Sequence, residues 1–245
     1  MLGRGDQDPI GVGYHELLGD IRGPGCPVCR GCNMAAWRYI DSLLWEFVND
    51  GGVRARLRRA HGFCREHALL ALEVAAEQGA ASGIATLYED FLLHARQEAI
   101  AVIGRRPRRL LRTNSAPDPV PLDPHERCPV CESVSRATDN YVRLLGGSEP
   151  DSEIGTAARR ELRSLRLPHL RRGIELAASH DDAERLLHVY LRGEAELRTD
   201  LHEFLRKQSY VHRDEPVSQR ERSSWRRAVH LVVGEPPPKR KPLRH

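Results

Sequence analysis

The sequence predicts an all-α protein built from two tandem, homologous helical modules. Hydrophobic residues recur at helical spacing along much of the 245-residue chain, and aromatic residues make up only 5% of it. No strand-like alternation surrounds the cysteine motifs. The strongest observation is an internal repeat, because ligand-type residues, tyrosines and apolar residues recur with a constant offset of 102 positions. This length is sufficient for two small domains with cores of their own.

The first module is expected to begin with the motif Cys26-Pro27-Val28-Cys29 and to extend to residue 104. Good helix formers and apolar residues at helical spacing predict four helices within it. The run Asn49-Asp50-Gly51-Gly52 ends the first of them, since glycine commonly follows a helix. The four predicted helices cover about 37–48, 53–60, 63–78 and 84–104.

The second module is expected to begin with Cys128-Pro129-Val130-Cys131. Helices are predicted near 132–145 and 157–165, and two more begin near Pro168 and Asp182. Prolines and arginines between the modules indicate a linker. The predicted organisation is a lead segment at 1–25, module 1 at 26–104, a linker at 105–127, module 2 at 128–212, a last helix within 213–234 and a disordered basic tail at 235–245.

The repeat also holds outside the cysteine motifs. Tyr39 corresponds to Tyr141, and Leu43 corresponds to Leu145. Further along, the run Leu72-Glu73-Val74-Ala75-Ala76 corresponds to Ile174-Glu175-Leu176-Ala177-Ala178. One register without gaps therefore aligns the core positions of both modules, which favours two copies of one helical unit.

A structural zinc site is predicted in the first module. Cys26 and Cys29 are three positions apart, so both thiolates can bind one ion, and the intervening proline stiffens the turn. Cys64 and His67 are also three positions apart on a predicted helix, so they lie on one face. Cys26, Cys29, Cys64 and His67 would complete a tetrahedral site that ties the start of the chain to the third helix.

The second module has a degenerate version of this site. The offset leads from His67 to His169, but from Cys64 to Arg166. Because arginine stays protonated, it repels a dication and supplies no ligand. We therefore expect no metal at the set comprising Cys128, Cys131, His169 and Arg166.

Two arrangements of Arg166 are consistent with this pattern. In the favoured one, a carboxylate such as Glu132 holds the guanidinium and the apolar core replaces the metal. In the other, Arg166 points away, and His125 or a water molecule supplies a fourth ligand. One zinc ion per chain is the expectation in the first case, and two in the second.

An iron–sulfur cluster is the alternative for the first site, since Cys32 adds a third cysteine near Cys26 and Cys29. With Cys64 these residues would supply four thiolates. Cys32 has no counterpart in the second module, where Val134 takes its position, whereas His67 does have one. The repeat therefore favours zinc.

Several function classes lack their sequence signals. Cys-Pro-Val-Cys resembles a dithiol redox motif, but a thioredoxin-like frame of strand, helix and strand is not predicted. His125-Glu126 before Cys128 does not match the H-x-E signature of zinc deaminases, and the sequence contains neither a Walker loop nor a G-x-S-x-G motif. The leading expectation is a zinc-stabilised interaction or scaffold protein. The alternatives are a thiol-based redox or metal sensor and a hydrolytic zinc enzyme at the open second site.

Charge and composition bear on partners and compartment. The formal net charge is only +4, from 38 basic and 34 acidic residues. Basic runs at 105–112 and 239–244 lack interleaved aromatic residues, so we expect solvated segments rather than a nucleic-acid surface. The sequence shows no secretory signal and no apolar run of membrane-spanning length. A cytoplasmic protein with a protein partner and no membrane contact is expected, in which the six cysteines are metal ligands or redox thiols.

Taken together, these motifs resemble a prokaryotic family known only as a domain of unknown function. The likeness rests on both Cys-Pro-x-Cys motifs, on 62–67 (Gly-Phe-Cys-Arg-Glu-His), on 167–170 (Leu-Pro-His-Leu), on 205–207 (Leu-Arg-Lys) and on 224–228 (Ser-Trp-Arg-Arg-Ala) with Gly234. It covers nearly the whole chain. The family usually carries Cys-Leu-Pro-His in its second half, so Arg166 is a departure. The resemblance implies the two-module architecture and no established activity.

Overall fold

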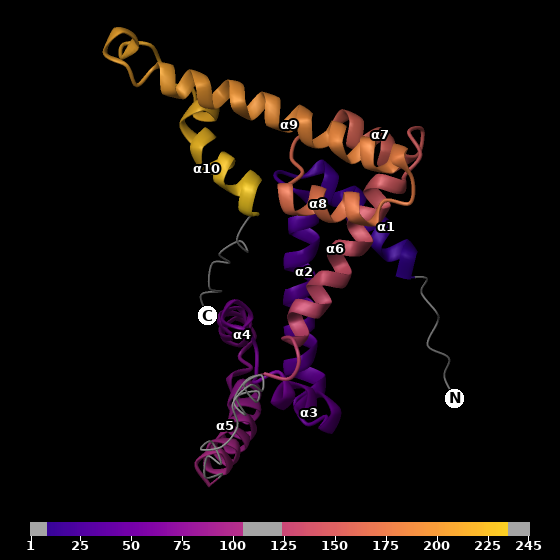
Figure 1. The fold of residues 1–245 in the computed structure, drawn as a ribbon, viewed down its shortest axis with the longest axis vertical. Coiled ribbons are helices and arrows are strands. Elements are labelled where there is room, and N and C mark those ends of the chain that lie inside the picture. The colour runs from indigo at the N-terminus through magenta and orange to yellow at the C-terminus, as the bar shows by residue number, and fades with distance from the viewer. Residues whose placement is uncertain (1–8, 105–123, 235–245) are drawn as a thin grey trace, which may run out of the picture. The chain divides into compact units, whose positions relative to one another are not determined.

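The computed structural model describes residues 9–104 and 124–234 (Figure 1). Their regular elements are all helices, with no strand within these two ranges, which confirms the all-α prediction. Within the same ranges, no helix is long and apolar enough to cross a membrane. Most of the expected linker, both basic runs and the C-terminal tail lie outside the described residues.

The described chain forms two compact units. Unit 1 comprises 9–33 and 135–234, and unit 2 comprises 34–104 and 124–134. These units differ from the predicted modules 26–104 and 128–212, because two helices, α2 (Pro27–Ser42) and α6 (Pro129–Gly147), each continue from one unit into the other. Each unit therefore contains the Cys-Pro-x-Cys motif of one half of the sequence and the following helices of the other half.

Three of the four helix starts keep the 102-residue offset to their counterparts in the second half, whereas the last counterpart begins three residues earlier than the offset predicts. In the first half, α2 is followed by a π-helical turn, Leu43–Phe47, and by three α-helices. In the second half, α6 leads directly into its three counterparts. The first-half helices are α3 (Gly51–Arg59), α4 (Arg65–Gln78) and α5 (Ala81–Gly104), and the second-half helices are α7 (Glu153–Arg160), α8 (Leu167–Leu176) and α9 (His180–Arg206).

Local sequence signals explain where these helices begin and end. The Asp50 side chain accepts a hydrogen bond from the backbone N–H of Val53 at the start of α3, and the side chain of Ser152 accepts one at the start of α7. Gly79 ends α4 with a φ of 66°, a left-handed conformation that glycine adopts without steric cost. The predicted breaks between the helices therefore follow from capping chemistry.

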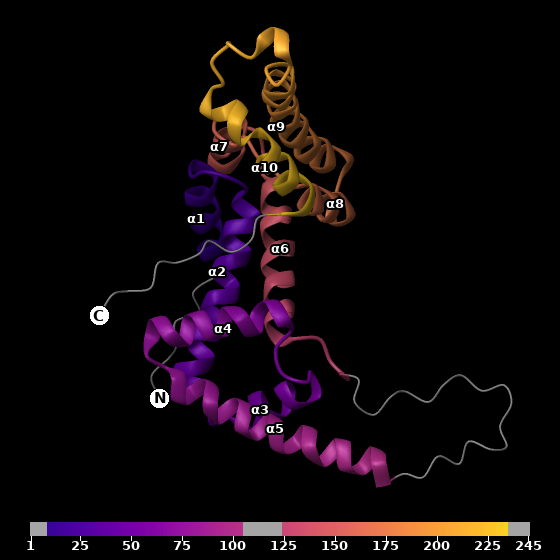
Figure 2. The same cartoon turned by 90° about the vertical axis from the view of Figure 1, so that its left-hand side faces the viewer.

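In unit 2, α5 packs on α3 and α4 (Figure 2). The apolar faces of these helices and of the second half of α2 enclose one core. The start of α6 contributes to it as well, since Val130 is fully buried there. The largest buried side chains of this core include Ile40, Leu43, Leu57, Phe63, Val74 and Leu87.

In unit 1, α1 (Pro9–Arg22) packs on α7, and α8 packs on α9. The apolar side of α1 is fully buried, with Leu17 at 0% and Ile21 at 2% exposure. The expected lead segment 1–25 therefore contains a helix that belongs to the core. Other fully buried side chains of unit 1 are Val142, Ile154, Leu162, Leu165 and Leu186.

The last helix, α10 (Gln219–Val233), lies along α9 (Figures 1 and 2). Ser218 and Glu221 form a capping box at its start. The Nζ of Lys207 lies 2.8 Å from both carboxylate oxygens of Glu221, and the two side chains are only 11% and 13% exposed. This ion pair connects the end of α9 to the start of α10.

Acid is expected to loosen α10. The hydrogen bond from Lys207 lowers the pKa of Glu221 below its ordinary value of 4.5. Because the folded pKa is the lower one, the stabilisation is present above about pH 4.5 and is lost as the pH falls through the folded pKa. The protection factors of the α10 amides against hydrogen exchange should therefore fall below pH 4.5. In Glu221→Gln these protection factors should already be lower at neutral pH and should change less with acid. A pH profile identical to that of the wild type would contradict this account.

Candidate metal centres

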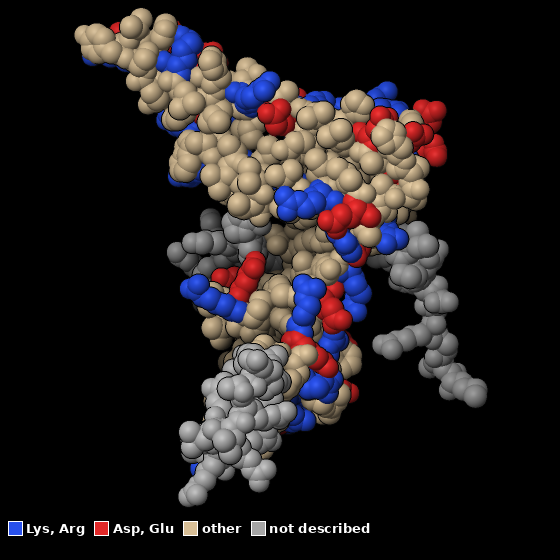
Figure 3. All heavy atoms as spheres, viewed as in Figure 1, with Lys and Arg blue, Asp and Glu red and all other residues tan. Residues whose placement is uncertain are grey.

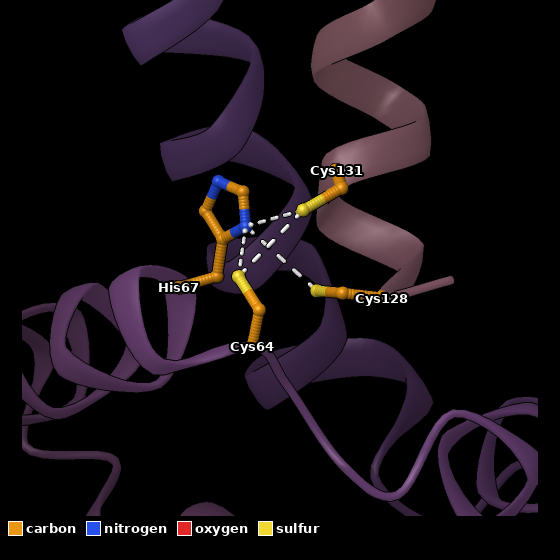
Figure 4. Close-up of side chains that lie close together, drawn as sticks. All are labelled: Cys64, His67, Cys128 and Cys131. Atoms are coloured by element: carbon orange, nitrogen blue, oxygen red, sulfur yellow. Dashed lines mark hydrogen bonds between the residues drawn. The ribbon is translucent and has the colours of Figure 1, made fainter. Parts of the chain in front are cut away.

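Unit 2 contains a cluster of Cys64, His67, Cys128 and Cys131, whose ligand atoms all lie within 4.8 Å of one another. Figure 4 shows the three sulfur atoms directed toward the His67 ring. The Nδ1 of His67 is 3.2 Å from the sulfur of Cys64, 3.3 Å from that of Cys131 and 3.7 Å from that of Cys128. Three sulfur atoms and one imidazole nitrogen that converge in this way match the ligand set of a tetrahedral zinc site.

Local structure positions both halves of this cluster. Cys64 is the N-cap of α4, and His67 follows in the first turn, so both side chains leave the same end of the helix. The preceding residues His61 and Gly62 have left-handed φ values of 52° and 85°, which turn the chain into the helix. Cys128 and Cys131 flank the first turn of α6.

The cluster concentrates thiol groups in a half-buried site. Burial raises the pKa of Cys128, but hydrogen bonds from His67 and the backbone N–H of Cys64 outweigh it and lower the pKa to about 6. Burial and the neighbouring Cys64 and Cys128 sulfurs raise the pKa of Cys131 to about 12. Without a cation, a second thiolate is therefore opposed by the first. A bound dication would remove this penalty.

Unit 1 contains a second cluster of Cys26, Cys29 and His169. The Nδ1 of His169 lies 3.4 Å from the sulfur of Cys26 and 3.8 Å from that of Cys29. The two cysteines are almost fully buried, at 0% and 5% exposure. Burial raises the pKa of Cys26, whereas the hydrogen bond from Cys26 and that from His169 lower the pKa of Cys29 to about 5.

Arg166 occupies the position of a fourth ligand in this cluster. It is the N-cap of α8 with φ −77° and ψ 147°, and Cys64 is the N-cap of α4 with φ −62° and ψ 162°. The backbone N–H of Arg166 hydrogen-bonds the sulfur of Cys26, as that of Cys64 does for Cys128. Its side chain is buried, at 3% exposure, and its charge also favours the Cys29 thiolate. Arg166 therefore has the N-cap position in unit 1 that Cys64 has in unit 2, and it brings a positive charge near Cys29 instead of a thiol.

The predicted grouping of the ligands requires correction. The structure does not combine Cys26 and Cys29 with Cys64 and His67; it places them with His169 and Arg166. Likewise, Cys128 and Cys131 lie with Cys64 and His67 rather than with His169. The reason is that α2 and α6 carry each Cys-Pro-x-Cys motif into the unit of the other half. The residues involved are nevertheless the eight that were predicted from the sequence. Each Cys-Pro-x-Cys motif lies beside a pair of residues at the start of a helix, Arg166 and His169 in unit 1 and Cys64 and His67 in unit 2.

The other expected contacts also differ. The sulfur of Cys32 lies 3.0 Å from the Thr138 hydroxyl, with which it shares a hydrogen bond, and Cys32 belongs to neither cluster. The four cysteines considered for an iron–sulfur site therefore do not converge. Glu132 pairs with Arg56, not with Arg166. The ring of His125 packs edge-on against that of His61, outside both clusters.

In comparisons with known proteins, no family model, no curated protein and no solved structure matches the chain. The Cys/His clusters therefore carry the functional argument. Each is placed so that it can hold a metal ion, and all six cysteines are free of disulfides.

Proposed function

We propose that the chain is a zinc-stabilised helical interaction protein with its metal in unit 2. The observation that carries the proposal is the convergence of four ligand atoms from Cys64, His67, Cys128 and Cys131. Three thiolates and one imidazole are a ligand set of structural zinc sites. Since the set joins residues 61 or more positions apart in the chain (64–67 and 128–131), metal binding would contribute directly to folding.

A closed set of four protein ligands favours a structural role over catalysis, because a catalytic zinc keeps one position for water or substrate. The open site considered from sequence, with Cys128, Cys131 and His169, is not assembled, since His169 lies with Cys26 and Cys29. No hydrolytic activity is therefore proposed.

Unit 1 is proposed to bind no zinc. Zinc with Cys26, Cys29 and a neutral His169 would be electrically neutral, and the buried guanidinium of Arg166 would add a positive charge beside it. In unit 2, the third thiolate gives the zinc site a charge of −1 instead. Without metal, one thiolate at Cys29 balances Arg166. In unit 1, the positive charge of the guanidinium would thus stabilise the thiolate as a metal ion would in unit 2.

This division between the sites can be tested by metal analysis. Protein purified under reducing conditions is expected to contain one zinc ion per chain. Arg166→Cys restores the fourth thiolate and is expected to contain two ions and to melt at a higher temperature. The matched control, Arg166→Met, removes the charge without adding a thiolate and should stay near one ion. Two tightly held ions in the wild type would contradict the assignment of unit 1.

A redox sensor is the second candidate, and one distance favours it. The sulfur atoms of Cys64 and Cys131 are 3.6 Å apart, and both residues are only partly buried. A peroxide would oxidise these two thiolates to a disulfide, be reduced to water and release the metal. Reversible zinc loss at low peroxide concentrations, before any unfolding, would favour this candidate over a purely structural centre.

The interaction role is supported by exposed apolar residues on α10. Trp225, Val229 and Val232 lie three or four positions apart, hence on one face, and are about half exposed. A nucleic-acid partner is not favoured, because basic and acidic side chains are intermixed on the face shown in Figure 3. The free cysteines are consistent with the reducing cytoplasm, which we propose as the compartment. We propose no membrane partner.

A further inference from the structure

Unit 2 has an open groove of about 560 Å³ beside its core. Residues of α2, of the π-helical turn, of α3 and of the start of α6 line it. The lining is mostly apolar and includes a few polar side chains, a composition that is typical of binding sites. The lining residues are Ala35, Arg38, Tyr39, Ser42, Leu43, Phe47, Val53 and Ser133.

The corresponding surface of unit 1 is covered by α1. The offset of 102 leads from Arg38 and Ser42 of the groove to Asn140 and Leu144 of α6. Gly13 of α1 lies against both of these residues, so closely that a Cβ on Gly13 would be 2.6 Å from the Asn140 amide nitrogen and 3.7 Å from a Leu144 methyl. The matching face in unit 1 is therefore a helix-docking surface.

Two further contacts place α1 on this face. The hydroxyl of Tyr141, the counterpart of Tyr39, donates a hydrogen bond to Glu16 of α1 at 3.4 Å. In addition, α1 packs on α7, which is the counterpart of α3, the helix that contributes Val53 to the groove. Unit 1 thus fills with one amphipathic helix the surface that no described helix covers in unit 2.

The chain does not supply a second copy of α1 in its described part. The sequence counterpart of α1 would be 111–124, where prolines at 117, 119, 121 and 124 do not favour a helix. All of this segment except residue 124 lies outside the described residues. On the groove itself, Phe47 is 42% exposed. An apolar docking surface without a covering helix is what a partner would use.

We propose that this groove binds an amphipathic helix of a partner protein. The partner helix would present apolar residues spaced like Leu17, Leu18 and Ile21 of α1, which are buried on the equivalent face. It would also carry a carboxylate at the position of Glu16, which in unit 1 accepts the hydrogen bond of Tyr141, the counterpart of the groove residue Tyr39.

One position distinguishes the partner helix from α1. Asp20 of α1 pairs with Arg30 at 3.1 Å, but the counterpart of Arg30 in unit 2 is Glu132. An acidic residue there would compete with Glu132 for its ion-pair partner Arg56 and would lack the arginine that Asp20 has, so the partner is expected to carry a neutral or basic residue instead. A second copy of this chain does not fit, because its α1 is already buried in its own unit 1. The proposal deepens the interaction role and does not depend on the metal.

A helix-stapled, fluorescent peptide with the α1 sequence 9–22, carrying lysine in place of Asp20, provides the probe. We expect saturable binding to the full chain, measured by fluorescence anisotropy. Phe47→Ala should weaken the binding by at least about tenfold, the loss typical of an aromatic anchor. The control Leu69→Ala also removes an exposed apolar side chain of unit 2, at 53% exposure, but Leu69 does not line the groove. It should leave the affinity within about twofold.

The peptide's failure to bind, or an equal effect of Phe47→Ala and Leu69→Ala, would overturn the docking site. Self-association of the full chain that Phe47→Ala abolishes would replace the partner helix by a second copy. Zinc content is measured on the same samples. Peptide binding to a chain without zinc would support the groove and contradict the proposed metal centre. A chain that contains zinc but does not bind the peptide would support the metal centre and contradict the groove.

Discussion

Replacing Cys128 by serine is expected to remove the zinc, whereas the matched replacement Cys26→Ser is expected to leave it in place. The two cysteines occupy equivalent positions in the sequence, each as the first residue of a Cys-Pro-Val-Cys motif. Only Cys128 lies within reach of His67, at 3.7 Å, together with Cys64 and Cys131. The pair of variants therefore tests which motif completes the Cys₃His centre.

The expected effect on stability is large. Loss of a structural metal is one of the few single-site changes that cost more than about 4 kcal/mol. For a unit of this size, each kcal/mol corresponds to roughly 4–8 °C, so the melting transition of unit 2 should fall by about 15 °C or more. Zinc content and hydrogen exchange of α4 are the measurements. Zinc retained in Cys128→Ser but lost in Cys26→Ser would instead support the pairing within each half of the sequence.

The sequence was sufficient to find the candidate ligands but not to group them correctly. Cys26 and Cys128 are each followed by Pro-Val-Cys, and both Cys64 and Arg166 are followed three residues later by histidine. Exchanging the two motifs therefore leaves every local pattern unchanged. What separates the alternatives is the course of α2 and α6 from one unit into the other, which depends on tertiary packing and not on helical periodicity.

The helices themselves were largely predictable, because their signals are local. Glycines and capping side chains mark the ends of α3 and α4, and apolar periodicity marks α5 and α9. The role of α1 was not predictable, since a helix of 14 residues with three glycines has a weak signal and is stabilised by burial of Leu17 and Ile21. The partner of Glu132 was also missed, because surface ion pairs depend on which helices meet.

A second large effect is expected for Gly31→Ala in unit 1. Gly31 lies on α2 at the point where Tyr141 of α6 crosses it, and a Cβ there would overlap the Cδ2 and Cε2 atoms of the tyrosine ring. The ring is 5% exposed and its hydroxyl bonds Glu16, so it has little room to move. Overpacking of a buried ring usually costs 1–3 kcal/mol, and we expect about 3 kcal/mol or more here.

Denaturant unfolding followed by the fluorescence of Trp225, the only tryptophan of unit 1, would measure this loss, with Trp37 and Trp45 replaced by phenylalanine. Gly19→Ala is the control, because its Cβ would meet no atom within 4 Å on the exposed side of α1. That change should be neutral or stabilise by about 0.5–1 kcal/mol.

A double-mutant cycle tests whether steric overlap with the Tyr141 ring causes the loss of stability. If Gly31→Ala destabilises because it strikes the Tyr141 ring, Tyr141→Ala should cancel most of that cost. The double variant would then be no less stable than Tyr141→Ala alone. Additive losses would show that the glycine matters for another reason. The zinc proposed for unit 2 should remain bound in all of these variants, since Cys64, His67, Cys128 and Cys131 lie in the other unit.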